Sequence, residues 1–231
     1  MSTVLITGAN RGLGLEFAAQ FAAEGWDTIA CCRNPETAAE LNQLGKKFPN
    51  LSIEALDVMS FDQIEALSAQ LKHRSIDVLI NNAGVYGDKA GHGFGDLDYQ
   101  MWHQTLLINT LAPVKMAEAF LSQLELGAKK LLVSITSQMG SIADNTSGGS
   151  ILYRSSKAAL NAAMKSLSLD LKAKAIGVLV LHPGWVRTDM GGPQGLIDAK
   201  QSVAGMRKII ENFSAEQSGQ FIKYDGSLLP W

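Results

Sequence analysis

Short apolar runs alternate with longer segments of helical periodicity along the whole chain. The runs are rich in aliphatic residues and cover 4–7, 27–32, 51–56, 77–80, 130–136 and 177–182. Between the first two runs, Leu13, Phe17 and Phe21 recur at helical spacing while polar residues keep to another face. Runs such as 77–80 are apolar without interruption, which is typical of strands buried on both faces. The alternation predicts an α/β fold, a doubly wound parallel sheet wrapped by helices.

The end of the chain predicts one further strand. Residues 220–224 read QFIKY and precede a turn at Asp225 and Gly226, and the closing residues are apolar enough to dock on the body. No linker, repeat or shift in composition interrupts the pattern. With 231 residues, 46% hydrophobic and 18% charged, we expect one domain over 1–231 with a substantial core.

Composition excludes several classes of protein. A formal net charge of -2 supplies no broad basic field, so nucleic acid is not expected as a partner. No apolar run reaches the length of a membrane span, and the first residues lack the features of a signal peptide, so we expect a cytoplasmic protein without membrane partners. Cys31 and Cys32 are adjacent in a predicted strand and are expected to be buried and free. The histidines show no metal-ligand spacing, so no metal is predicted.

A glycine-rich turn, TGANRGLG, joins the first strand to the first helix. Gly8, Gly12 and Gly14 allow a tight turn and a close approach of the backbone to a pyrophosphate, and the helix N-terminus offers unpaired N–H groups. A P-loop is excluded because the turn continues Gly-Leu-Gly and not Gly-Lys-Ser/Thr. The turn therefore predicts a dinucleotide site that also includes Asn10 and Leu13.

Charge at the second strand bears on the identity of the dinucleotide. Sites for NAD place a carboxylate there to hold the ribose 2′-hydroxyl, but this chain has Arg33 and no acid. Arg33, together with Arg11 in the glycine turn, suits a 2′-phosphate, which favours NADP over NAD. Asp57 and Val58 end the third strand and are expected to frame the adenine ring. The alternative for Asp57 is a simple turn residue.

Tyr153 and Lys157 stand four residues apart where a Gly- and Ser-rich stretch changes into a helical pattern. Four residues is about one helical turn, so both side chains share a face. A nearby ammonium stabilises the tyrosinate, so we expect the pKa of Tyr153 to fall below its ordinary value of about 10. Such a phenol is suited to proton transfer near neutrality. An ordinary surface pair is the alternative, which the dinucleotide turn makes less favourable.

Taken together, these motifs resemble the short-chain dehydrogenase/reductase family, and the resemblance runs nearly end to end. In the family's order they are TGANRGLG at 7–14, DV at 57–58, NNAG at 81–84, Asn109, Ser137, Tyr153 with Lys157, and HPGWVRTD at 182–189. The resemblance implies a single-domain Rossmann fold with a seven-stranded parallel sheet and helices on both faces. RGLGLEF, LLINTLAP and the Trp-terminated tail are most similar to its small carbonyl reductase-like group, which includes C-factor and sniffer proteins.

The resemblance also implies roles for the catalytic candidates. Tyr153 would protonate the alkoxide that forms when a carbonyl accepts hydride, and Lys157 would bind the nicotinamide ribose. Ser137 would hydrogen-bond the substrate oxygen. Because the interval to Tyr153 is longer than is common, Ser141 remains the alternative. Asn109 would kink its helix and anchor a proton-relay water near Lys157.

Further cofactor-binding residues follow from the same resemblance. Asn81 would tie neighbouring strands together, and Thr188 would hydrogen-bond the nicotinamide carboxamide. The other cofactor-binding candidates at strand ends are Asn82, Ala83, Gly84, Pro183, Gly184 and Val186.

The predicted activity is NADP-dependent reduction of an aldehyde or ketone. The alternatives are an NAD-dependent alcohol dehydrogenase with the same site and a dinucleotide-binding signalling or sensor protein. Tyr86, Met139, Trp185 and Met190 are expected around a partly apolar substrate pocket. The glycines of 91–95 are expected in a mobile loop and not in a second nucleotide site. The helix at 151–173 suggests a homodimer or higher homo-oligomer.

Overall fold

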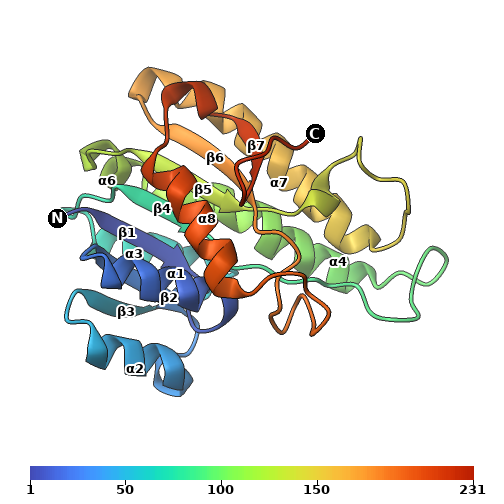
Figure 1. The fold of residues 1–231 in the computed structure, drawn as a ribbon, viewed down its shortest axis with the longest axis horizontal. Coiled ribbons are helices and arrows are strands. Elements are labelled where there is room, and N and C mark those ends of the chain that lie inside the picture. Colours follow the sequence, from blue (N-terminus) through green and yellow to red (C-terminus); the bar gives the residue numbers. More distant parts are fainter.

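Seven parallel strands form one sheet at the centre of the computed structural model, which describes residues 1–231 (Figure 1). Their order is β3-β2-β1-β4-β5-β6-β7, so the prediction of a doubly wound seven-stranded parallel sheet is confirmed. The chain reverses its direction of winding between β1 and β4, where open sheets of this kind bind ligands. The strands are β1 Thr3–Thr7, β2 Asp27–Cys32, β3 Leu51–Ala55, β4 Val78–Asn81, β5 Leu131–Ile135, β6 Gly177–His182 and β7 Gln220–Lys223.

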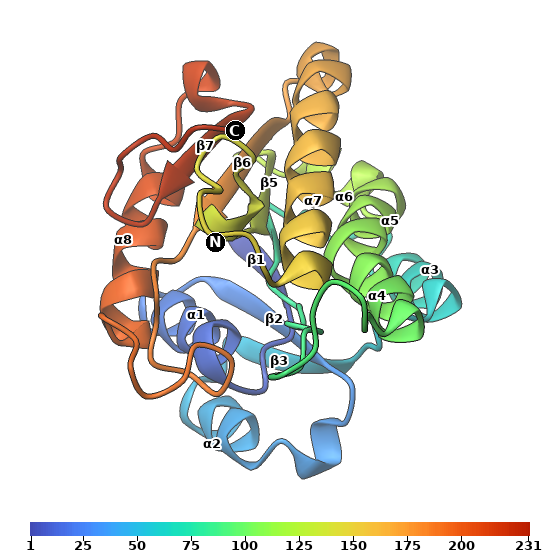
Figure 2. The same ribbon diagram turned by 90° about the vertical axis from the view of Figure 1, so that its right-hand side faces the viewer.

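Helices cover both faces of the sheet, with α1, α2 and α8 on one face and α3 to α7 on the other (Figure 2). The helices are α1 Gly12–Ala23, α2 Ala39–Lys47, α3 Phe61–Gln70, α4 Tyr99–Leu106, α5 Ala112–Ala119, α6 Leu121–Leu126, α7 Ile151–Asp170 and α8 Ala199–Glu211. A π-helical turn at Leu107–Leu111 joins α4 to α5, and short 3₁₀ turns lie at Pro35–Thr37, Gln138–Gly140, Lys172–Lys174 and Ala215–Gln217. No helix combines the length and the apolar character needed to cross a membrane.

The core consists of two apolar layers, one on each face of the sheet. Successive strand residues point to opposite faces, so Val4 and Ile6 join the layer under α1 while Leu5 joins the other. Phe17 and Phe21 of α1 are fully buried, as the helical spacing predicted. Each such side chain stabilises the fold by about 1.5–3 kcal/mol. This burial holds the first helix, and therefore the glycine turn before it, firmly on the sheet.

The end of the chain folds back across β7. Gly226 forms the predicted turn with a φ of 91°, and the backbone N–H of Leu229 donates to Phe221 O at 2.9 Å. The Trp231 ring packs on Phe221 with 5.5 Å between the ring centroids. The carbonyl oxygen of Trp231 accepts hydrogen bonds from the N–H groups of residues 142 and 143, each at 2.9 Å. The tail thereby fixes the loop that precedes α7.

Candidate active site

A cavity of about 550 Å³ lies at the carboxyl ends of the central strands. Most of the predicted cofactor-binding residues line it: Gly8, Asn10, Arg11, Gly12, Leu13, Gly14, Arg33, Asp57, Val58, Asn82, Ala83, Gly84, Tyr153, Lys157, Pro183 and Thr188. Gly184 and Val186 do not line it. A Cβ on Gly184 would lie 2.9 Å from the Tyr224 ring, and Val186 is buried in a bridge to Ile197. These two residues shape the segment after β6 and do not face the cavity.

The glycine turn is packed so tightly that a side chain at Gly8 or Gly14 would clash with backbone, whereas Gly12 has space around it but a φ of 54°. A Cβ on Gly14 would lie 2.2 Å from Gly8 O, and a Cβ on Gly8 would lie 2.9 Å from the Cα of Ala83. Asn82 Nδ2 donates to Thr7 O at 2.9 Å and to Gly8 O at 3.1 Å, which braces the turn from β4. Helix α1 begins at Gly12 and no side chain caps it. Its first N–H groups therefore suit the pyrophosphate of a dinucleotide.

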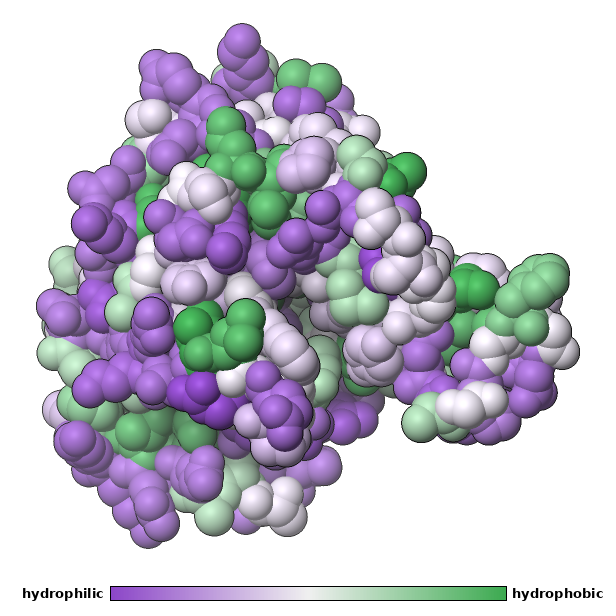
Figure 3. Space-filling view, turned by 45° about the vertical axis from the view of Figure 1, so that its right-hand side comes forward, coloured by the Kyte–Doolittle hydropathy of each residue, from purple (hydrophilic) through white to green (hydrophobic).

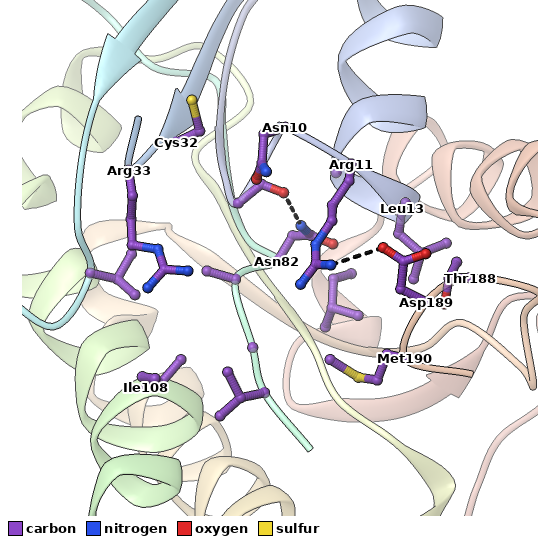
Figure 4. A pocket seen from close by; sticks show the side chains of 18 of the residues that line it. Asn10, Arg11, Leu13, Cys32, Arg33, Asn82, Ile108, Thr188, Asp189 and Met190 are labelled. Atoms are coloured by element: carbon purple, nitrogen blue, oxygen red, sulfur yellow. Dashed lines mark hydrogen bonds and ion pairs between the residues drawn. The ribbon is translucent and has the colours of Figure 1, made fainter. Parts of the chain in front are cut away.

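Two arginines line the cavity in different ways. Arg11 Nη1 lies 2.8 Å from Asp189 Oδ2, and this pair is exposed. Arg33 enters from the side of β2 and is exposed (Figure 4). Asp189 was not among the predicted site residues, although it directly follows Thr188 in HPGWVRTD. Because Asp189 engages Arg11, Arg33 is the cation better placed to meet an added phosphate.

Several lining residues were not predicted from the sequence: Cys32, Asn34, Thr37, Ala38, Leu56, Met59, Val85, Ile108, Ile135, Thr136 and Asp189. Most of them directly end or follow a strand, or belong to the turn after β2. In the sequence, these residues could therefore be recognised only by their position at or just after a strand end, and not by their residue type. Asp57 lines the cavity, and its Oδ1 accepts a hydrogen bond from the Met59 N–H at 3.0 Å, so it has the role of a turn residue, while its contact with an adenine ring stays a prediction.

Tyr153 and Lys157 lie at the start of α7, and both are buried at the cavity wall. Lys157 Nζ donates to Ile135 O at 2.9 Å and lies 5.8 Å from the centroid of the Tyr153 ring. Burial lowers the pKa of Lys157 to about 8, because the charged form loses its hydration. The helix thus brings a phenol and an ammonium together at the cofactor cavity.

The expected lowering of the Tyr153 pKa is wrong. Burial raises the pKa of Tyr153 to about 12, the hydroxyl of Ser137 acts in the opposite direction by hydrogen bonding, and the nearby Tyr86 raises it further. The largest cause is desolvation, because the buried phenolate loses its hydration. Tyr153 is therefore a neutral phenol near pH 7, a form that can donate a proton.

The two serine candidates differ in what their hydroxyl groups contact. Ser137 follows β5, and its hydroxyl accepts the N–H of Met139 at 3.1 Å and lies close enough to the Tyr153 phenol to lower its pKa. Ser141 Oγ donates to Trp231 O at 3.0 Å and accepts the N–H of Asp144 at 3.0 Å. The hydroxyl of Ser141 therefore holds the chain end, and the geometry favours Ser137 as the partner of Tyr153.

Asn109 lies in the π-helical turn, so the predicted irregularity in its helix is present. Its side chain is fully buried, with Oδ1 accepting the N–H of Val85 at 2.9 Å and Nδ2 donating to Val85 O at 2.8 Å. A Cβ on Gly84 would meet Asn109 Oδ1 at 3.2 Å and Lys157 Nζ at 3.6 Å. Asn109 and Lys157 therefore flank the same glycine, while the relay water remains a prediction.

Asn81 has the predicted task of tying strands together. Its Nδ2 donates to Ser134 Oγ of β5 at 3.4 Å and to Pro113 O at the start of α5 at 3.2 Å. These bonds link β4 to its neighbouring strand and to the helix above it. Asn81 therefore supports the edge from which Asn82 reaches the glycine turn.

Aromatic and apolar side chains surround the mouth of the site. The ring centroids of Tyr86 and Tyr153 lie 4.8 Å apart, and the Tyr86 hydroxyl forms a hydrogen bond with Ser150 Oγ at 2.7 Å. Trp185 and Met190 are half exposed on the segment after β6. The loop between β4 and α4, which carries the glycines of 91–95, extends away from the body, and Figure 3 shows a hollow beside it. Of the four predicted pocket residues, Met190 lines the cavity, whereas Tyr86, Met139 and Trp185 do not, so a partly apolar substrate pocket stays a prediction.

Comparisons with known proteins place this geometry among its relatives. The family model for short chain dehydrogenase matches residues 2–196. The C-signal protein of Myxococcus xanthus is 47% identical over 156 residues, which is 68% of this chain and 93% of that protein. The structure of the carbonyl reductase Sniffer of Drosophila melanogaster superposes with a TM-score of 0.92 at 37% identity, covering all of both chains. The NADPH-bound carbonyl reductase from chicken fatty liver gives a TM-score of 0.92 at 35% identity, covering 100% of this chain and 99% of that one.

Proposed function

The chain belongs to the short-chain dehydrogenase family, and from that premise we propose that it reduces the carbonyl group of an aldehyde or ketone with NADPH. The observation that carries the proposal is the placement of a buried, neutral phenol, with the Ser137 hydroxyl near it, at one end of a dinucleotide cavity. Two solved carbonyl reductases share the whole fold, and one of them is described with NADPH bound.

The residues present fit a bound dinucleotide. The glycines of the turn line the cavity without side chains, so their backbone is open to a pyrophosphate, and Arg33 supplies a cation at the end of β2 for a 2′-phosphate. Lys157 and Thr188 line the cavity and are positioned to hold the ribose and the carboxamide. When bound, the reduced nicotinamide supplies the hydride for the reaction.

Ser137 and Tyr153 act on the substrate oxygen. Their two hydroxyl groups donate hydrogen bonds to the carbonyl, which polarises it and stabilises the negative charge that develops on the oxygen. Tyr153 then gives its proton to the alkoxide. Lys157, whose pKa is about 8, is mostly cationic near pH 7 and stabilises the tyrosinate that is left.

A panel of aldehydes and ketones with NADPH tests this proposal on the wild type, Tyr153→Phe and Tyr86→Phe. We expect Tyr153→Phe to bind NADPH but to lose about a hundredfold or more of kcat, because the proton donor is gone. Tyr86→Phe keeps the ring that packs on Tyr153 and should retain most of the activity. Full activity of Tyr153→Phe would show that the mechanism is wrong.

The choice of NADPH over NADH is tested at the two arginines. Arg33→Ala should weaken NADPH binding by about tenfold to a hundredfold, because a charge-assisted hydrogen bond contributes about 1.5–3 kcal/mol. Arg11→Ala should have a smaller effect, because Asp189 already engages Arg11. NADH binding should change little in either variant. Tighter binding of NAD(H) than NADP(H) to the wild type would favour the alternative, an NAD-dependent alcohol dehydrogenase.

The likeness to the C-signal protein supports a second candidate, a signalling or sensor protein that binds a dinucleotide. The two candidates differ in turnover. A wild-type chain that binds NADPH but reduces none of the carbonyl compounds in the panel would favour the sensor.

A further inference from the structure

We propose that Asp88 is a positioning residue that holds Tyr153 in place by binding the first turn of α7. The proposal rests on the proposed function, because it assigns Asp88 a part in the carbonyl reduction carried out by Tyr153. Asp88 lies in the loop after β4, 65 residues before the tyrosine that it contacts.

Helix α7 lacks the N-terminal cap that its own sequence should supply. Ser150 stands at the N-cap position, but its backbone is left-handed, with φ 46° and ψ 47°, and its side chain makes no capping bond. A normal cap has an extended backbone that turns the side-chain oxygen toward the first N–H groups. Without one, the amides of the first turn need another acceptor.

Asp88 supplies that acceptor from a different part of the chain. Its Oδ2 accepts the N–H of Tyr153 at 2.8 Å, and its Oδ1 accepts the N–H of Leu152 at 3.2 Å. Both carboxylate oxygens are therefore used, one for each amide. A negative charge at a helix N-terminus is also favourable, because the helix dipole is positive there.

The position of Asp88 is itself fixed by contacts on either side of the loop. Val85 is bonded through both its N–H and its carbonyl to the buried Asn109. Gly87 has a φ of 80°, and a Cβ there would lie 2.2 Å from Thr105 Oγ1, so the loop lies directly on α4. The Tyr86 ring packs against the ring of Tyr153.

The segment from 85 to 88 thus connects two predicted catalytic residues. One end binds the side chain of Asn109 and the other binds the backbone of Tyr153. Because the hydroxyl of Tyr153 must meet a substrate carbonyl within hydrogen-bond reach, a small shift of its backbone reduces the rate of proton transfer.

Asp88→Ala and Asp88→Asn test the proposal, with Asp198→Ala as the matched control. Asp198 caps α8 by accepting the Gln201 N–H at 2.8 Å, so its loss removes a similar bond from a helix that does not carry Tyr153. We expect kcat to fall by about tenfold or more in Asp88→Ala and by less in Asp88→Asn, which retains one acceptor oxygen. The NADPH dissociation constant should stay within about twofold, and Asp198→Ala should keep its kcat.

Amide hydrogen exchange, followed by NMR, provides a second measurement that needs no turnover. The amides of Leu152 and Tyr153 should exchange at least about tenfold faster in Asp88→Ala than in the wild type, because their acceptor is lost. Unchanged exchange at both amides would overturn the proposal, and so would faster exchange with an unchanged kcat. If the wild type binds NADPH but reduces no carbonyl compound, the proposed function fails, and the exchange rates still decide whether Asp88 holds Tyr153.

Discussion

Replacing Lys157 by methionine should change how the stability of the protein depends on pH. The side chain of Lys157 is buried, and burial lowers its pKa from 10.5 to about 8. This difference corresponds to about 3 kcal/mol of destabilisation whenever the lysine is charged in both the folded and the unfolded states, that is, below about pH 8. Methionine has a similar shape and no charge, so Lys157→Met removes that cost. It also leaves Ile135 O without its donor, which costs about 1–3 kcal/mol.

The sign of the pH dependence follows from proton binding. Between about pH 8 and pH 10.5 the unfolded wild type keeps a proton on Lys157 that the folded protein has released. The lysine therefore destabilises the wild type less as the pH rises through this range. The difference in free energy of unfolding between Lys157→Met and the wild type becomes smaller as a result. From about pH 6.5 to pH 9.5, the free energy of unfolding of Lys157→Met relative to the wild type should fall by about 2 kcal/mol.

Urea unfolding of the cofactor-free proteins at both pH values measures this change. Lys165→Met is the matched control, because Lys165 lies on the same helix and donates to Gly219 O, but its side chain is exposed. The free energy of unfolding of Lys165→Met relative to the wild type should stay nearly constant between the two pH values. A difference between Lys157→Met and the wild type that does not change with pH would refute the burial argument. Lys157→Met should also lose carbonyl reduction, because nothing stabilises the tyrosinate.

Three further predictions concern the rest of the site. Ser137→Ala should lower kcat by about tenfold to a thousandfold, because a donor to the substrate oxygen is lost. Ser141→Ala should retain most of the kcat and lower the Tm, and steady-state kinetics with thermal unfolding measures both effects. A larger loss of kcat in Ser141→Ala than in Ser137→Ala would favour Ser141 as the catalytic serine. Gly14→Ala should abolish NADPH binding or folding, because its Cβ would lie 2.2 Å from Gly8 O, and fluorescence titration showing wild-type affinity would contradict this. Burial and the nearby Glu54 raise the pKa of Cys31, so in a Cys32→Ser variant the Cys31 thiol should react with Ellman's reagent only after unfolding, and rapid reaction of that native variant would show that the strand opens.

For Arg11, the sequence predicted the location of the side chain but not its ion-pair partner. The sequence placed it at the cavity, and it lies there, but its partner Asp189 comes from the segment after β6. The interval between these two residues is too long for any local pattern to relate them. Asp88 is a similar case, since it reads as a polar loop residue until the fold brings it to the first turn of α7.

The sequence by itself determined the fold class, the glycine turn and the pairing of Tyr153 with Lys157. Each of these depends on spacing within a single element, and helical and strand periodicity record such spacing directly. Only the tertiary structure favoured Ser137 over Ser141, and it reversed the expected pKa of Tyr153. Both outcomes depend on burial and on contacts between distant parts of the chain. The lysine one turn away was visible in the sequence, but the loss of water around the phenol was not, and that loss has the larger effect on its ionisation.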